Sequence, residues 1–408
     1  MMMSEQPILF TLNIATLCII LFSTHQLLLR AQDRRIYQPL SLCLVSIGMV
    51  ICMPSIRLLL PQLQVAILIL SLPALLLISP CLWLYTKGLT SQTPWQLSKS
   101  EFKHFIPAIF GSLLALTALC LPTKYVNAVL LTEQLSVVEQ APSMMRYTIY
   151  GVLIFTFLSI MGWVLQSAWY VFKIIARLKS YRNQLQDVFA STEQKELHWL
   201  SWLIISVGGV WVFTAINLVL DNLFTPIYFD DRIYPLLYLL VVYSLALWGL
   251  RQKPGFAELY SLPTSHNSAQ LIEMDSEEAN QNGEQKYRRS ALDPAQANQI
   301  GQKIEHAMQV DKLYLDASLS LPKLAAHIHI SPNYISQTLN ENLGTRFFDY
   351  INKYRVTEAK RYLQTTHNTI LDIAMTVGFN SKSAFYSAFK KHTGFTPKQY
   401  KKQHHTNE

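Results

Sequence analysis

The side chains best suited to chemistry in this sequence form two polar sets near its C-terminal end, about 50 residues apart. They carry amides, hydroxyls and ammonium groups, which donate and accept hydrogen bonds or supply positive charge. We find no Gly-rich phosphate loop and no convincing pair of nucleophile and base, so we expect binding rather than catalysis. The first set is Ser331, Asn333, Tyr334, Gln337, Thr338 and Asn340, and the second is Ser381, Lys382, Ser383, Tyr386, Ser387, Lys390, Lys391 and Lys398.

Metal and cofactor chemistry are not expected either. His327 and His329 would point to different faces of a helix, and His404 and His405 lie in a tail that would fray. The five cysteines lack the paired spacing of a metal site and lie within apolar runs, where they should pack as small apolar side chains. These cysteines are Cys18, Cys43, Cys52, Cys81 and Cys120.

Short amphipathic helices separated by turns must position the two polar sets. Ser331 and Pro332 are typical of a helix N-cap and first turn, and the helix that they start would turn Ile335 inward. A shorter apolar helix precedes each set, which predicts two helix-turn-helix units, and a longer helix between them would hold the units apart. The pattern repeats with one spacing: Ile335, Leu339 and Gly344 recur 50 residues later as Phe385, Phe389 and Gly394.

The second unit and its surroundings contain a series of motifs: Gly344-x-x-Phe347, Tyr350-Ile351, Arg355-Val356-x-x-Ala359, Ile373-Ala374-x-x-Val377-Gly378-Phe379, Phe385, Phe389-Lys390, Gly394 and Thr396-Pro397-x-x-Tyr400. Together they closely resemble the signature of AraC/XylS-type transcription regulators. The resemblance covers residues 296–402 and does not extend to residues 1–250, where nothing resembles the sugar-binding part of soluble members. The overall layout is similar to that of membrane-embedded members with a multi-span sensor.

The resemblance implies that the second helix of each unit enters the major groove of double-stranded DNA, and two readers about 34 Å apart would match one duplex turn. The two polar sets are then the candidate DNA-binding residues, with Lys390, Lys391 and Lys398 expected on phosphates. Many family members have Arg and Lys where this chain has Gln337 and Asn340, so the first unit should attract phosphate less. The resemblance also implies a homodimer, with RNA polymerase as a further candidate partner.

Composition divides the chain into three parts. Half of the 408 residues are hydrophobic and only 15% are charged, whereas soluble proteins carry charge on about 25% of residues. Residues 251–292 lose hydrophobic periodicity and are rich in Ser, Asn, Gln and Glu, which is typical of a flexible linker. We therefore predict an all-α protein with a membrane domain at 1–250, a linker at 251–292 and a basic DNA-binding domain at 293–408.

Seven uncharged apolar runs are long enough to cross a bilayer as helices, which requires roughly 20 residues. None alternates as a barrel strand would, so a seven-helix transmembrane bundle is expected. Residues 125–145 are too polar to cross and should form an external loop with a surface helix. The runs are 6–29, 36–56, 58–86, 105–123, 147–172, 197–220 and 233–250.

The distribution of Lys and Arg predicts the orientation in the membrane. With the N-terminus outside, the inner connections carry 13 Lys and Arg and the outer ones carry 4. Seven spans then place the C-terminal domain in the cytoplasm, so we expect an inner-membrane protein in contact with lipids. The start of the chain has Glu5 and no basic residue, which argues against a cleaved secretory signal.

Polar residues inside the spans need partners away from lipid and could line a pocket for a small-molecule or membrane signal. The alternative is hydrogen bonding between helices. The candidate ligand-binding residues are Asn13, Tyr150, Trp163, Gln166 and Asn217.

An apolar stripe follows the fifth run at a spacing of four and three residues: Ile174, Leu178, Tyr181, Leu185 and Val188. It could pair with its symmetry mate, carry movement inward, or lie on the membrane surface. The whole pattern favours a membrane-embedded transcription regulator that couples a sensed signal to DNA binding. A transporter or receptor with a secondary DNA-binding tail, or a DNA-tethering membrane protein without sensing, are the alternatives.

Overall fold

The computed structural model describes residues 6–30, 34–132, 134–193, 195–208, 233–257 and 292–405. Within these ranges the regular secondary structure is all helical, apart from one isolated antiparallel bridge between Phe189 and Ser320. The all-α class predicted from the sequence is thus confirmed for the described residues. The chain forms two compact units, one of Met1–Leu178 with Leu197–Phe256 and one of Lys179–Glu196 with Ala257–Glu408.

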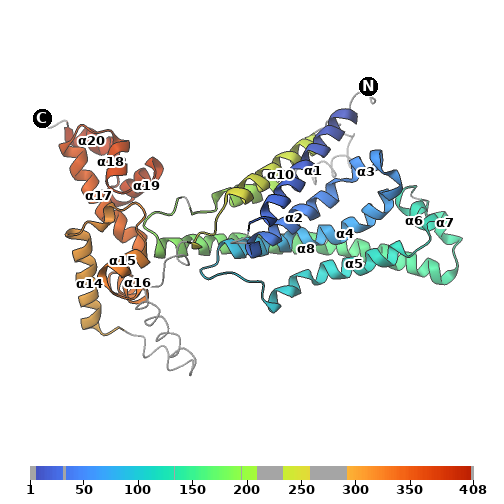
Figure 1. Cartoon of the computed structure of the whole chain (residues 1–408), viewed down its shortest axis with the longest axis horizontal. Coiled ribbons are helices and arrows are strands. Elements are labelled where there is room, and N and C mark those ends of the chain that lie inside the picture. Colours follow the sequence, from blue (N-terminus) through green and yellow to red (C-terminus); the bar gives the residue numbers. More distant parts are fainter. Residues whose placement is uncertain are drawn as a thin grey trace. The chain divides into compact units, whose positions relative to one another are not determined.

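The first unit is a set of long apolar helices (Figure 1). Helix α4 packs against α2 and α5, and α1 packs against α2 and α10. Residues 125–145, expected to be an external loop with a surface helix, contain most of one short helix and all of a second. The described helices are α1 (Gln6–Leu28), α2 (Arg34–Ile51), α3 (Met53–Leu59), η1 (Pro61–Leu63), α4 (Gln64–Leu89), η2 (Lys99–Phe105), α5 (Ile106–Leu119), α6 (Thr123–Leu130), α7 (Leu135–Glu139), α8 (Ser143–Val188), His198–Gly208 and α10 (Ile233–Arg251).

Each of the seven apolar runs contains a helix, but the structure does not establish seven spans. Five described helices are long and apolar enough to cross a membrane, and a sixth span results if α2 and α3 count as one. The run 36–56 was predicted as one span in which Pro54 could kink the helix, and α2 and α3 meet at a bend of 54°. Pro54 lies in the first turn of α3, where its missing N–H and its ring break the helical hydrogen-bond pattern. The run 197–220 is helical at His198–Gly208, and the rest lies outside the described residues.

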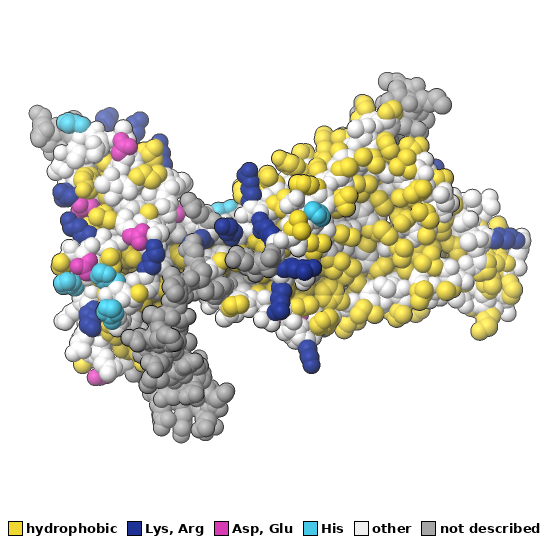
Figure 2. Space-filling model, viewed as in Figure 1, with side chains coloured by type: hydrophobic (Ala, Val, Ile, Leu, Met, Phe, Trp, Pro, Cys, Tyr) yellow, Lys and Arg dark blue, Asp and Glu magenta, His cyan; other side chains and the backbone are white. Residues whose placement is uncertain are grey.

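The outer surface of the first unit is predominantly apolar. Figure 2 shows hydrophobic side chains covering its visible face, with Lys and Arg gathered near its ends. Large side chains such as Leu21, Phe157 and Leu165 are 74%, 61% and 74% exposed. A soluble protein seldom exposes a contiguous apolar surface of this kind, whereas a bilayer would cover it.

The second unit consists of short helices around one longer helix, α17. Its elements are α14 (Pro294–Gln309), η4 (Leu313–Leu315), α15 (Leu321–Ile328), α16 (Pro332–Gln337), the π-helical turn η5 (Thr338–Asn342), α17 (Phe347–Thr365), α18 (Ile370–Thr376), α19 (Lys382–Thr393) and α20 (Pro397–His405). The pairs α15–α16 and α18–α19 are the two predicted helix-turn-helix units, and α17 is the predicted longer helix between them.

Each helix-turn-helix has its own apolar core, and α17 contributes to both. Phe347 and Ile351, near the start of α17, pack in the first cluster with Ile335. Val356 and Leu363, further along α17, pack in the second cluster with residues of α18 and α19. One continuous helix therefore joins the two cores.

The turns inside the two units share a left-handed residue and an equivalent hydrogen bond. His329 (φ 56°) and Gly378 (φ 94°) both adopt left-handed conformations at the end of the first helix. The next residue donates its N–H to an alanine carbonyl in both cases, Ile330 to Ala325 and Phe379 to Ala374. The two left-handed residues are thus 49 residues apart, whereas the starts of α16 and α19 are 50 residues apart. The stretch from the left-handed residue to the start of the reading helix is therefore one residue longer in the second unit.

Residues 179–196, which we call the α8 tail, belong to the second unit although their helix begins in the first. Tyr181 and Leu185 are completely or almost completely buried, and Ile174, earlier on the stripe, is 1% exposed. These three positions of the stripe are therefore buried, whereas Leu178 and Val188 are half-buried. This finding favours neither pairing with a symmetry mate nor lying on the membrane surface.

Candidate nucleic-acid interface

The first reading helix, α16 with η5, presents most of its predicted residues to solvent. Asn333, Tyr334 and Asn340 are exposed, and Gln337 is half-buried. Thr338 was expected to face outward, and this is wrong, because it is only 1% exposed. It lies three residues after Ile335 and therefore shares the inward face of the helix.

The second reading helix, α19, exposes more of its predicted DNA-binding side chains to solvent. Lys382, Ser383, Ser387 and Lys390 are exposed, while Tyr386 is half-buried. The Lys382 ammonium lies 5.6 Å from the centre of the Tyr386 ring, a cation–π distance that fixes both side chains on one face. This face carries hydroxyl and ammonium groups that suit base edges and phosphates.

The two reading helices start differently. The Ser381 hydroxyl accepts a hydrogen bond from the Ala384 N–H at 3.1 Å, so Ser381 caps α19. Ser331 occupies the N-cap position of α16 with Pro332 in the first turn, but its side chain makes no capping hydrogen bond. Ser381 therefore stabilises its helix directly, whereas the hydroxyl of Ser331 does not cap α16.

The ends of the two reading helices differ in charge. The first has an exposed acidic residue, Glu341, whose carboxylate accepts a hydrogen bond from Gln337 at 2.8 Å. The second ends in Lys390, Lys391 and His392. The Lys391 ammonium is already paired with Asp349 Oδ1 of α17 at 2.7 Å. Lys390 and the exposed Lys398 are thus better placed than Lys391 to contact phosphate.

Replacing Lys390 with Ala is expected to weaken binding to all duplexes alike and to lower the slope of log affinity against log salt by about 0.9, because one phosphate contact is lost. Fluorescence anisotropy of a labelled duplex over a range of salt concentrations measures this slope. Lys391→Ala is the matched control and should change the slope less, since Asp349 already neutralises its ammonium. Equal slope changes in both variants would contradict this assignment.

Arg355 joins distant segments of the DNA-binding unit, a role that the sequence did not reveal although the residue lies within the matched signature. It is fully buried, and its guanidinium donates to the carbonyls of Tyr314 at 2.7 Å and Asp316 at 2.8 Å. It also donates to the Ala190 carbonyl of the α8 tail at 3.2 Å. Burial lowers the pKa of Arg355 to about 10, against the opposing effect of Glu193 and Asp316, so the side chain stays charged at neutral pH. The sequence signal that could have revealed this role is the position of a charged residue on the apolar face of α17, between Ile351 and Ala359.

The four predicted ligand-binding residues that the structure describes do not all meet at one site, although Trp163 and Gln166 both lie against Leu76. Asn13 binds the Ile51 carbonyl and the Ser55 hydroxyl, at 2.7 and 2.6 Å, and Gln166 donates to the Leu76 carbonyl at 3.2 Å. Both amides thus link helices, which was the alternative. Trp163 packs against the apolar cluster of α4 and α5, and Tyr150 is half-buried on α8. Asn217 lies outside the described residues, and the ligand-binding role of all five stays a prediction.

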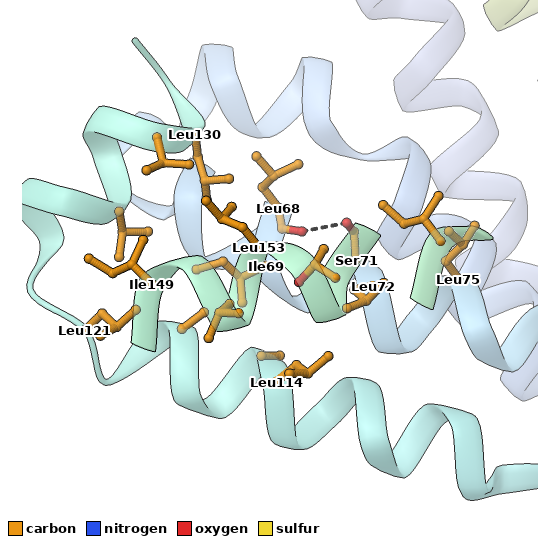
Figure 3. A pocket seen from close by; sticks show the side chains of 17 residues that line it. Leu68, Ile69, Ser71, Leu72, Leu75, Leu114, Leu121, Leu130, Ile149 and Leu153 are labelled. Atoms are coloured by element: carbon orange, nitrogen blue, oxygen red, sulfur yellow. Dashed lines mark hydrogen bonds between the residues drawn. The ribbon is translucent and has the colours of Figure 1, made fainter. Parts of the chain in front are cut away.

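A different cavity in the first unit is a better candidate for a ligand (Figure 3). It has a volume of about 290 Å³ and lies among α4, α5, α6 and α8. Its lining is aliphatic with two hydroxyls, Ser71 and Thr156, and no charged or aromatic side chain. The Ser71 hydroxyl donates to the Leu68 carbonyl at 2.6 Å, so it does not need a hydrogen-bond acceptor from a bound ligand. This chemistry suits an apolar molecule.

Comparison with known proteins places the C-terminal part among helix-turn-helix proteins. Residues 324–403 match a family model described as a helix-turn-helix domain. The melibiose operon regulatory protein of Escherichia coli strain K12 is 36% identical over 87 residues, which are 21% of this chain and 29% of that protein. The uncharacterized HTH-type transcriptional regulator YtdP of Bacillus subtilis strain 168 is 31% identical over 109 residues, which are 27% of this chain and 14% of that protein. The aligned stretch thus spans less than a third of either relative.

Solved structures also match part of the chain. A protein of unknown function from Listeria innocua is 35% identical and the match covers 26% of this chain and 97% of that one, with a TM-score of 0.24. The C-terminal domain of AraT, a response regulator from Geobacillus stearothermophilus, is 31% identical, with coverages of 28% and 88% and a TM-score of 0.23. The C-terminal part of the chain is an AraC-type helix-turn-helix domain, as found in DNA-binding transcription regulators.

Proposed function

We propose that this chain is a membrane-embedded, sequence-specific transcription regulator, in which the apolar unit senses a signal and the AraC-type domain binds DNA. The observation that carries the proposal is the pair of helix-turn-helix units on α17, each with polar side chains exposed on its reading helix. Two such units joined by one helix suit two successive segments of the major groove.

The apolar helices and their exposed Leu, Phe and Trp side chains support membrane embedding. The Lys173 ammonium lies 5.3 Å from the Trp83 ring and 5.6 Å from the Trp169 ring. Such aromatic and basic groupings are typical of the membrane–water interface. With the excess of Lys and Arg in the same connections, they support a chain in the inner membrane with an outer N-terminus and a cytoplasmic DNA-binding domain.

The aliphatic cavity is the best candidate for the sensing site. Its lining would bind an apolar compound or a lipid acyl chain, because a polar ligand would lose hydrogen bonds to water without replacing them. We infer that the signal is an apolar molecule or a change in the bilayer. Dimerisation and contact with RNA polymerase belong to the same proposal by analogy with the family.

Binding of DNA to oriented membrane vesicles tests this function. A duplex selected from a random-sequence library with the full chain should bind inverted vesicles, which expose the cytoplasmic face, and should not bind right-side-out vesicles. Vesicles without the chain are the control. The proposal is contradicted if the chain leaves the membrane in a high-salt wash, or if right-side-out vesicles bind the duplex.

A further inference from the structure

The α8 tail is anchored at the start of the first helix-turn-helix. Ala190 is 1% exposed and belongs to the apolar core of that unit. Its N–H donates to the Leu319 carbonyl at 3.1 Å, and the neighbouring Phe189 forms an antiparallel bridge with Ser320. Ser320 is the N-cap of α15, so the tail is bound where the first helix of the unit begins.

The α8 tail makes a second contact at the start of α17, directly after the first helix-turn-helix. Arg346 is the N-cap of α17, and its guanidinium donates to Asn183 Oδ1 at 3.1 Å and to Gln186 Oε1 at 3.0 Å. Its Nε also lies 3.7 Å from Asp187 Oδ1. Three side chains from adjacent turns of α8 therefore hold the start of α17.

The third contact reaches the second helix-turn-helix as well. Arg355 binds the tail through the Ala190 carbonyl and the Ser191 hydroxyl, at 3.2 and 3.1 Å. The Arg355 Nε lies 3.1 Å from the position that a Cβ would occupy at Gly378, the turn of the second unit. One buried side chain thus contacts the tail and also packs at the second turn.

The tail has internal bonds that give it a defined shape. The Tyr181 hydroxyl donates to the Lys195 carbonyl at 2.9 Å, and Arg182 pairs with Glu196 at 3.0 Å. Burial raises the pKa of Glu193, which lies near Arg355. The tail therefore docks as a folded segment rather than as a loose strand.

We propose that the α8 tail couples the apolar unit to DNA binding: when docked, it holds the two helix-turn-helix units in the arrangement that engages DNA, and a signal that shifts α8 undocks it and lowers DNA affinity. The inference rests on the proposed function. Two facts carry it. The tail continues α8, a candidate membrane span, without a break up to Val188. Its contacts leave the exposed groups of both reading helices uncovered.

A substitution in the buried part of the tail tests the coupling. In the full chain in lipid nanodiscs, Ala190→Asp should raise the dissociation constant for the selected duplex by about fivefold or more, the lower end of typical allosteric coupling. Ser180→Asp adds the same charge on an exposed position of the tail and should leave the constant unchanged. Hydrogen exchange should show faster exchange around Leu319 in the Ala190 variant, with α19 unaffected. Equal affinities in all three proteins would overturn the proposal.

A reversible cross-link provides a test within one folded protein. Residues paired across an antiparallel bridge have Cα atoms about 4.5–5.5 Å apart, within reach of a disulfide. The double variant Phe189→Cys/Ser320→Cys should bind DNA weakly when reduced and return to within about twofold of the wild-type affinity when oxidised, because the bond restores docking. The five native cysteines all belong to the first unit. An affinity that does not depend on the redox state would contradict the coupling.

The results separate this inference from the proposed function. If the wild-type chain binds no duplex, the function itself fails. If it binds DNA and neither the Ala190 variant nor the cross-link changes affinity, the function stands and the coupling role of the tail is wrong.

Discussion

Replacing Arg355 with Met is expected to destabilise the DNA-binding unit by about 3 kcal/mol or more, because three buried carbonyls lose a hydrogen-bond donor and each unsatisfied group costs about 1–3 kcal/mol. Met fills much of the same volume but donates no hydrogen bond. The carbonyls of Tyr314, Asp316 and Ala190 would then be buried without their partner, and each lost partner is costly. Because the pKa of Arg355 is about 10, the effect should be present throughout the neutral range.

Native-state hydrogen exchange of the full chain measures this loss, because the slowest amides of α17 report the free energy of opening the unit. Lys353→Met is the matched control, since it makes the same replacement on an exposed position of the same helix and should change stability by less than about 0.5 kcal/mol. Arg355→Lys should recover only part of the loss, because an ammonium cannot reproduce the planar fork of a guanidinium. Similar stability in the Arg355 and Lys353 variants would show that the buried network contributes little.

The elements of both units were largely predictable because local patterns determine them. Uncharged apolar runs can only be helices in lipid, and every such run contains a helix. The 50-residue recurrence of Ile335 and Leu339 as Phe385 and Phe389 located the cores of both helix-turn-helix units, and all four side chains are buried. Helical periodicity also gave most of the exposed reading positions.

Polarity and hydropathy were poorer guides than helical spacing and backbone chemistry at two positions, Thr338 and Pro54. Thr338 was taken as outward because it is polar, although its spacing from Ile335 and Leu339 places it on the inward face. In the run 36–56 the hydropathy continues through Pro54, which was a candidate for a kink, and the helix bends there because the proline breaks the hydrogen-bond pattern. In both cases spacing or backbone chemistry decided the outcome over residue type.

The docking of the α8 tail could not be predicted, because it depends on tertiary contacts between distant segments. The stripe of Tyr181 and Leu185 indicated a buried face but not the surface that buries it. The main hydrogen bonds of Ala190 involve its backbone carbonyl and its backbone N–H. Any residue type has these groups, so the sequence does not reveal the bonds. This docking also changes how a signal could travel. A flexible linker of the kind predicted at 251–292 would transmit motion poorly, whereas the tail is a direct continuation of an apolar helix.

Gly378→Ala is expected to have the other large effect, a loss of about 3 kcal/mol or more from the stability of the second helix-turn-helix, because two costs add. The first cost is the left-handed backbone (φ 94°), which is unfavourable by roughly 1–2 kcal/mol for a residue with a Cβ. The second is steric: the new Cβ would lie 2.6 Å from the Tyr314 carbonyl oxygen and 2.9 Å from that of Leu315. Both oxygens belong to backbone that Arg355 and η4 hold in place, so they cannot move aside cheaply.

Gly394→Ala separates these two costs. Gly394 has a similar conformation (φ 80°) at the end of α19, and nothing lies within 4 Å of its added Cβ. This variant should lose only the conformational cost, roughly 1–2 kcal/mol. Hydrogen exchange of α18 and α19 in the full chain measures both losses, and only Gly378→Ala should also abolish the salt-dependent binding assigned to Lys390, because it displaces α19 from the turn. If both glycine variants lost the same stability, the close packing of the second turn against Tyr314 would not constrain the reading helix, and the link from Arg355 to the second helix-turn-helix would be absent.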